Sequence, residues 1–191
     1  MTPSANTSAL DLPLPDPLPE DVQVLFSKCM AKLGLIPNVL VTYAHRPEKL
    51  RAFSLMYNDL MLGPSGLSKL EREMIAVAVS SRNGCWYCQV AHGAQVRAIS
   101  GDPALGEAMA MNWRVADLSE RQREMLEFSM KVTENSAAIT QADRDALSAQ
   151  GFTDEDIFDV AAVAAFFNMS NRHASAIAMQ PNPEYHAMAR G

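Results

Sequence analysis

The sequence predicts an all-α protein, and three observations support this prediction. Apolar residues recur every three or four positions from Glu20 onward, which is the spacing of a helix that buries one face. Several segments open with Ser or Thr followed three residues later by an acidic or amide side chain, which is the pattern of a helix start. No segment shows the sustained two-residue alternation of a strand. A chain of 191 residues, 48% of them apolar, is long enough to form one sizeable core.

The N-terminal region differs in composition from the rest of the chain. It contains five prolines, which remove backbone donors and favour an extended conformation: Pro3, Pro13, Pro15, Pro17 and Pro19. We therefore expect an extended arm over residues 1–19 and a single helical domain over residues 20–191.

Glycine and proline bound the first three predicted helices. Apolar residues between Asp21 and Leu33 share one face, and Gly34 ends the pattern. A second helix is expected after Pro37-Asn38, and a third runs from Pro47 to the break at residues 63–66.

Capping patterns mark the later helices. In each pair, a side-chain oxygen and a residue three positions on satisfy free amides of the first turn: Ser68 with Glu71, Ser119 with Gln122, Thr140 with Asp143, and Thr153 with Asp156. Asp102-Pro103 should open another helix, with Asp as cap. The segment Val160–Phe167 is apolar on nearly all sides, which predicts a central, buried helix.

Composition excludes several classes of protein. With 16 basic and 22 acidic residues and no Lys/Arg run, the chain lacks the basic face of a nucleic-acid-binding protein. No apolar stretch reaches the ~20 residues that cross a membrane, and the N-terminus lacks the apolar stretch of a signal peptide. We expect a cytoplasmic protein in a reducing compartment, because three cysteines cannot form a disulfide framework.

The segment that carries chemistry surrounds a predicted turn at Asn83-Gly84. This dipeptide should end one helix and lead into the next, which places Cys85 at or near a helix N-terminus. The free amides and the dipole there favour an anion and lower the pKa of a thiol. At ~100° per residue, Cys85, Cys88 and His92 fall within a sector of about 60°. The three side chains should share one face.

These residues suit redox chemistry. Two thiols three residues apart on a helical turn can form a disulfide with little backbone movement, and His92 can take a proton from Cys88 or stabilise its thiolate. If the two helices are antiparallel about the turn, Glu73 comes within about one turn of His92 and can orient it. The spacing does not decide which thiol is the nucleophile, since the helix terminus favours Cys85 and His92 favours Cys88.

Two other interpretations of the cysteines compete with redox chemistry. A lone Cys-x-x-Cys can be buried packing, or it can be part of a zinc site with an imidazole and a carboxylate. Ligands so close together on one helix fit a tetrahedron poorly, and the added histidine and carboxylate make the set more specific. We therefore favour redox chemistry.

The pattern Glu73-x11-Cys85-x-x-Cys88-x3-His92 resembles the alkylhydroperoxidase D (AhpD)-like group of the carboxymuconolactone decarboxylase superfamily, and more closely its peroxidase-related members. Flanking segments, which extend the resemblance to roughly residues 30–175, are similar as well: Gly34–Asn38, Leu67–Ile75, Phe167-Asn168 and Asn171-Arg172.

The resemblance implies an AhpD-like helical bundle and a homo-oligomer, often a trimer or hexamer. It also implies that Cys88 is the peroxidatic thiolate, that Cys85 resolves its sulfenic acid as a Cys85–Cys88 disulfide, and that His92 and Glu73 relay protons. The substrate would be a hydroperoxide, and an external thiol or dithiol would reduce the disulfide. No bound cofactor is needed.

Four further residues are weaker candidates for the site. Tyr87 stands where the best-known members carry His, and a phenol with a pKa near 10 is a poor base, so the relay is shorter here. Trp86 can line a substrate pocket or pack on a neighbouring subunit. Asn168 and Arg172 can reach the site or form a structural hydrogen bond.

The sequence therefore predicts a thiol-dependent, peroxidase-like oxidoreductase. One alternative is a decarboxylase-like acid–base enzyme of the same superfamily that uses His92 and Glu73. Another is a redox-sensing or metal-binding protein without turnover.

Overall fold

The computed structural model describes residues 7–190, so residues 1–6 of the predicted arm and Gly191 lie outside the described part. Within residues 7–190 every regular element is a helix, which confirms the predicted class. The α-helices are α1 (Glu20–Leu33), α2 (Asn38–Ala44), α3 (Pro47–Leu62), α4 (Lys69–Arg82), α5 (Trp86–Ser100), α6 (Pro103–Asn112), α7 (Glu120–Asn135), α8 (Gln141–Ala149), α9 (Asp154–Ala176) and α10 (Glu184–Ala187). Two short 3-10 turns follow α6 and α7, over Trp113–Val115 and Ser136–Ala138.

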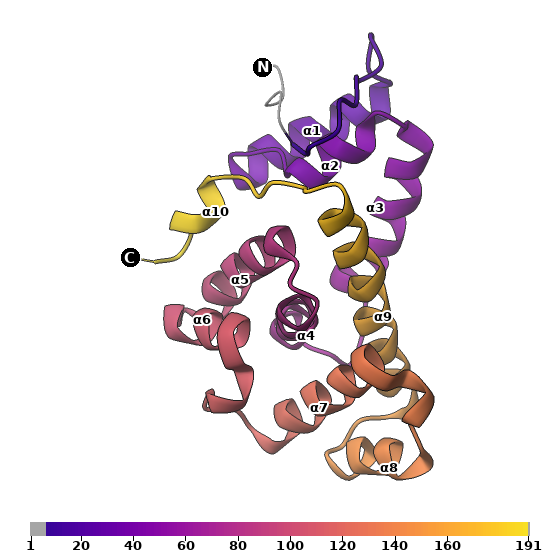
Figure 1. Cartoon of the computed structure of the whole chain (residues 1–191), viewed down its shortest axis with the longest axis vertical. Helices are drawn as coiled ribbons and strands as arrows, with labels where there is room; N and C mark the ends of the chain where they lie inside the picture. The colour runs from indigo at the N-terminus through magenta and orange to yellow at the C-terminus, as the bar shows by residue number, and fades with distance from the viewer. Residues whose placement is uncertain (1–6, 191) are drawn as a thin grey trace.

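Helix α4 lies at the centre of the molecule. Figure 1 shows it nearly end-on, with α5, α6, α7 and α9 around it. Ten consecutive residues of α4, Glu71 to Ser80, are buried. A helix surrounded on all sides must bury its charged residues too, and each of these needs a partner. Arg72 donates to the carbonyl oxygens of Leu67, Leu60 and Gly63, and Glu71 pairs with Arg121 at 3.1 Å.

The prediction for Val160–Phe167 is wrong in part. The segment belongs to α9 and most of it is buried, but Ala165 is exposed, as are Phe158 and Met169 on either side of it. These positions are seven and four residues apart, so they form one outward-facing stripe of α9. Within the segment this stripe is occupied by the small apolar residue Ala165, so the pattern looked apolar on all sides. The helix at the centre of the molecule is α4.

The predicted helix starts are confirmed. Each capping pair forms as expected; at α4, for example, the amide of Glu71 donates to the hydroxyl of Ser68 at 3.1 Å, and the amide of Ser68 donates to the Glu71 carboxylate at 2.7 Å. Asp102 caps α6, with Pro103 at the first helical position. Each such cap contributes about 1 kcal/mol, so these local signals fix where the helices begin.

Residues 7–9 lie beside the segment that follows α9. The amide of Ala9 donates to the carbonyl oxygen of Ile177, and the amide of Gln180 donates to that of Thr7, each at 2.9 Å. Residues 7–19 form no regular element, and Leu14 and Leu18 pack against the apolar cluster under α1. The division of the chain into an arm and one domain stays a prediction.

The segment after α9 crosses to α5, where the short helix α10 lies (Figure 1). Arg97 of α5 anchors it by donating to the carbonyl oxygens of Tyr185 at 2.7 Å and Met188 at 3.0 Å. This contact buries the ring of Tyr185 in an apolar cluster with Cys85 and Cys88. The C-terminal segment therefore covers the residues that the sequence marks for chemistry.

None of the helices within residues 7–190 combines the length and apolar character that crossing a membrane requires.

Candidate active site

Cys85 is the N-cap residue of α5, as the turn at Asn83-Gly84 predicts. Gly84 has a φ of 65°, the left-handed conformation that glycine adopts without strain. This turn lets the amide of Cys85 donate to the carbonyl oxygen of Ser80 at 2.9 Å, so the start of α5 is tied to the end of α4. The thiol of Cys85 is thereby held at the helix N-terminus.

The two thiols lie together and are enclosed. Cys85 caps α5 through its sulfur, which accepts a hydrogen bond from the amide of Cys88 at 3.5 Å. Both thiols are free, and the residues are only 1% and 2% exposed. The predicted juxtaposition of Cys85 and Cys88 is confirmed, and their burial means that a substrate can reach them only after some local movement.

The pair shares its charge unequally. The pKa of Cys85 is lowered to about 6, chiefly because the thiol of Cys88 donates a hydrogen bond to it. The same hydrogen bond, together with burial, raises the pKa of Cys88 well above its ordinary value. The two shifts describe one shared proton, which rests on Cys88 while Cys85 carries the negative charge.

Glu73 and His92 form the second half of the site. Nδ1 of His92 lies 2.6 Å from Oε2 of Glu73, and the two side chains are about 10% exposed. The antiparallel α4–α5 pair predicted this contact, and the structure confirms it. A carboxylate that holds Nδ1 leaves Nε2 as the nitrogen free to exchange a proton. The ring of Phe167 packs edge-on against His92, with centroids 4.7 Å apart.

Polar residues of α9 complete the surroundings of the thiols. The side chains of Asn171 and Ser175 help to lower the pKa of Cys85, and those of Asn171 and Ser170 partly offset the rise in the pKa of Cys88. Asn171 is fully buried and also donates to the hydroxyl of Ser80 at 2.9 Å. Sequence reasoning assigned these residues no role at the thiols. The available signal was a set of small polar residues on one side of an otherwise apolar helix.

Tyr87 and Trp86 have other contacts, although Tyr87 packs in the same apolar cluster as the two cysteines. The hydroxyl of Tyr87 accepts a hydrogen bond from the amide of Val39 at 3.2 Å, and burial raises the pKa of Tyr87 well above its ordinary value. It therefore acts as a structural link to α2 and cannot act as a base. Trp86 is 56% exposed and lies beside the ring of His186, 5.5 Å away between centroids. It lines a groove of about 240 Å³ between α5, α6 and α10.

Asn168 and Arg172 have a structural environment. Arg172 donates to the backbone carbonyl oxygen of Asn168 at 2.7 Å and to its side-chain oxygen at 2.8 Å. Asn83, in the turn before Cys85, donates to the same side-chain oxygen at 3.0 Å. The hydrogen-bond pair therefore supports the α4–α5 turn from α9.

A carboxymuconolactone decarboxylase family model matches residues 47–104, a segment that contains all four residues of the site. The structure of a peroxidase-related protein from Silicibacter sp. TM1040 is 60% identical in sequence, covers 100% of this chain and 99% of that chain, and superimposes with a TM-score of 0.95. The chain belongs to the carboxymuconolactone decarboxylase family. It falls in the AhpD-like, peroxidase-related group.

Other members of the same fold extend the comparison. An AhpD-core, peroxidase-related protein from Ralstonia eutropha JMP134 is 45% identical over 97% of both chains, with a TM-score of 0.93. The debrominase Bmp8 shares the fold, with a TM-score of 0.76 and 21% identity over 93% of this chain and 94% of that chain. No curated protein matches the chain.

In the present chain, no group of three or more His, Cys, Asp or Glu side chains within residues 7–190 is placed to hold a metal ion. The thiol of Cys88 donates to the sulfur of Cys85, and His92 hydrogen-bonds Glu73, so the four side chains are arranged as two pairs. The zinc alternative would need all four to converge on one point.

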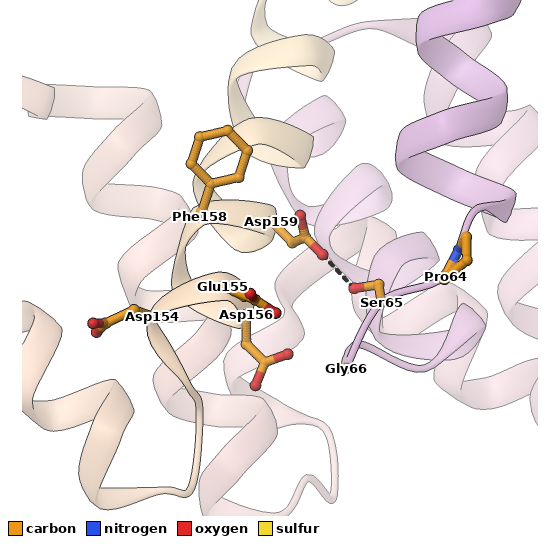
Figure 2. Close-up of a pocket in the computed structure, with 8 residues that line it drawn as sticks. All are labelled: Pro64, Ser65, Gly66, Asp154, Glu155, Asp156, Phe158 and Asp159. Atoms are coloured by element: carbon orange, nitrogen blue, oxygen red, sulfur yellow. Dashed lines mark hydrogen bonds between the residues drawn. The ribbon is translucent and has the colours of Figure 1, made fainter.

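A larger cavity, of about 500 Å³, lies away from the thiols. Figure 2 shows acidic side chains of the first turns of α9 beside the loop at residues 64–66, where the hydroxyl of Ser65 donates to Asp159 at 2.5 Å. Asp156, which lines this cavity, precedes Asn171 by 15 residues, roughly 22 Å along the helix. Its carboxylate caps α9, so these acids have a structural explanation.

Proposed function

We propose that this protein is a thiol-dependent, peroxidase-like oxidoreductase that reduces hydroperoxides through a Cys85–Cys88 dithiol/disulfide cycle. The observation that carries the proposal is the pair of thiols sharing one proton at the start of α5, beside the Glu73–His92 pair. A thiolate stabilised by a neighbouring thiol and a helix N-terminus is the nucleophile that this chemistry needs.

The first step is attack by Cys88. His92 holds the first proton released by the two thiols, and the remaining proton moves from Cys88 to Cys85. The sulfur of Cys88 then attacks the terminal oxygen of the hydroperoxide, so that an S–O bond forms, the O–O bond breaks and the leaving alkoxide becomes an alcohol, with the proton held by His92 making up the balance. The cysteine is oxidised by two electrons and the peroxide is reduced by two.

The second step closes the disulfide. The sulfur of Cys85 attacks the sulfenic acid of Cys88, the S–S bond forms, and the proton of Cys85 leaves with the hydroxide as water. Because Cys85 already lies one helical turn from Cys88, little backbone movement is needed. An external thiol or dithiol then reduces the disulfide. A reducing compartment such as the cytoplasm would supply that reductant, and the cycle uses no bound cofactor.

The resting charge lies on Cys85, yet we assign the attack to Cys88. Nucleophilicity falls as the pKa of a thiol falls, so the less acidic Cys88 is the stronger nucleophile once its proton has moved. Cys88 also lies one turn from His92 along α5, and Cys85 lies two turns away.

The test is stopped-flow consumption of hydroperoxide, with and without a dithiol reductant. Wild type should consume about one equivalent without the reductant and turn over repeatedly with it. Cys88→Ser should lose both activities, whereas Cys29→Ser, which alters the half-buried third cysteine on α1, should keep them. Equal consumption by wild type and Cys88→Ser would refute the assignment, and a dimedone adduct on Cys85 in that variant would reverse the roles.

The Glu73–His92 contact favours a second candidate, an acid–base enzyme in which the cysteines are incidental. The 2.6 Å pair is complete without either sulfur. On this alternative, the double variant Cys85→Ser/Cys88→Ser keeps full turnover on a carbon acid, whereas the thiol cycle predicts complete loss of peroxide reduction in the same variant.

A further inference from the structure

Tyr57 on α3 has a hydroxyl group that its surroundings leave unused. Of the four tyrosines, Tyr43 hydrogen-bonds Nδ1 of His173 at 3.0 Å, and Tyr87 accepts from the amide of Val39 at 3.2 Å. The hydroxyl of Tyr57, like that of Tyr185, has no hydrogen-bond partner between residues 7 and 190. The Tyr57 side chain is half-buried and its hydroxyl oxygen is not enclosed, so the group is open to solvent or to a ligand.

Tyr57 lies against the catalytic histidine. Its ring centroid is 6.4 Å from that of His92, and the ring is held by Phe53 and Phe166, each 6.2 Å away between centroids. Helix α3 carries Tyr57 to this place from the side opposite α10, since α3 packs on α4 and α9 (Figure 1). The aromatic contacts fix the ring and leave the hydroxyl group as the one polar atom of the side chain.

The surrounding charges keep Tyr57 protonated. Burial raises the pKa of Tyr57 well above its ordinary value, and the negative charge of the Glu73 carboxylate raises it further. Glu73 acts on Tyr57 because its carboxylate holds the imidazole of His92, against which the ring of Tyr57 lies. A phenol in this environment donates a hydrogen bond or a proton, and it cannot act as a resting base.

We propose that Tyr57 is a catalytic residue that donates a proton to the oxygen leaving from the hydroperoxide. The inference deepens the proposed function and rests on it. Tyr57 would also supply the proton that a histidine at position 87 could have supplied, because Tyr87 stands there and its hydroxyl is bound to α2.

The protons balance with Tyr57 included. When the thiolate of Cys88 takes the terminal oxygen and the O–O bond breaks, the leaving alkoxide takes the hydroxyl proton of Tyr57 and departs as an alcohol. The phenolate of Tyr57 then regains the proton that His92 accepted from the thiol pair. The sum is two thiols and a hydroperoxide giving a disulfide, an alcohol and water.

The test compares oxidants whose leaving groups differ in basicity. Tyr57→Phe removes only the hydroxyl group, and we expect it to slow reduction of tert-butyl hydroperoxide by about 100-fold, which is typical of a lost general acid. Peracetic acid releases a carboxylate that needs no proton, so its reduction should stay within about twofold of wild type. The normal rate with peracetic acid also shows that the variant is folded and that its thiols are reactive.

Tyr43→Phe is the matched control, because its hydroxyl is bound to His173, and it should leave both rates unchanged. Equal slowing of both oxidants in Tyr57→Phe would mean a structural role and overturn the inference, as would an unchanged rate with tert-butyl hydroperoxide. If wild type consumes neither oxidant, the proposed function fails and the inference falls with it. If wild type is active and Tyr57→Phe has the same rates, the role of Tyr57 is refuted while the proposed function stands.

Discussion

At the scale of single residues, the site depends on how charge is divided between two sulfurs and a histidine–carboxylate pair. Cys85 gains its low pKa from a hydrogen bond donated by Cys88, so the acidity belongs to the pair. Glu73 holds one nitrogen of His92 and leaves the other for proton exchange. Each pair can be tested by removing one member.

Removing the thiol of Cys88 should change the acidity of Cys85. A lowered pKa means that the thiolate forms at lower pH, so the rate of alkylation of Cys85 in wild type should rise with pH around a midpoint of about 6. In Cys88→Ala the donated hydrogen bond is lost, and the midpoint should move up by at least one pH unit. The measurement is the rate of iodoacetamide reaction against pH, in a Cys29→Ser background, and identical midpoints would contradict the prediction.

Replacing Glu73 by Gln should weaken proton exchange at His92. The neutral amide no longer stabilises a protonated imidazole, so we expect kcat/KM for hydroperoxide to fall at least about 10-fold. Glu127→Gln, which alters an exposed ion pair with Arg114, provides the comparison and should keep wild-type kinetics. Wild-type kinetics in Glu73→Gln would remove His92 and Glu73 from the cycle.

At the scale of elements, α4, α5 and α9 build the site and the C-terminal segment encloses it. The α4–α5 turn brings Glu73 opposite His92, while α9 delivers Asn171 to the thiols. Tyr185 of α10 packs in the same cluster as both cysteines. We therefore expect the anchoring of α10 by Arg97 to determine how often the thiols become accessible.

Arg97→Met should expose the thiols more often. The substitution removes the hydrogen bonds to the carbonyl oxygens of Tyr185 and Met188, and losing a hydrogen bond from a charged group costs about 1.5–3 kcal/mol. We expect alkylation of Cys85 at fixed pH to become about 10-fold faster. Arg114→Met, at an exposed ion pair elsewhere, should have no effect, and equal alkylation rates in both variants would show that access does not require release of α10.

At the scale of the whole molecule, large apolar side chains remain on the surface of the isolated chain. Phe158 on α9 is 71% exposed and Leu55 on α3 is 75% exposed, and these two helices pack on each other. An exposed apolar surface of this kind is typical of a protein–protein interface. We propose that this surface is an interface between copies of the chain in the homo-oligomer, a trimer or hexamer, that the family resemblance implies.

A charge at Phe158 should weaken self-association. We expect wild type to have the mass of a trimer or hexamer in light scattering coupled to size-exclusion chromatography, and Phe158→Glu to have a lower mass at the same helical content. Gln141→Glu adds the same charge at an exposed position of α8 and should leave the mass unchanged. A monomeric wild type, or an unchanged mass for Phe158→Glu, would exclude this stripe as the interface.

The sequence by itself determined the features that depend on local structure. Helix starts at Ser68, Ser119 and Thr153 follow from side chains that bond amides three residues away, and the shared face of Cys85, Cys88 and His92 follows from helical spacing. The Glu73–His92 contact was also predictable, because a short turn leaves two helices little choice but to pack antiparallel.

Only the tertiary structure decided which groups from distant segments reach these residues. It placed Asn171 on the thiols and Tyr57 beside His92, turned Tyr87 toward α2, and put α4 at the centre in place of Val160–Phe167. It also gave the resting charge to Cys85, through a proton held by Cys88. Such contacts join residues tens of positions apart, and they depend on how whole helices pack, which the spacing within any one helix does not specify.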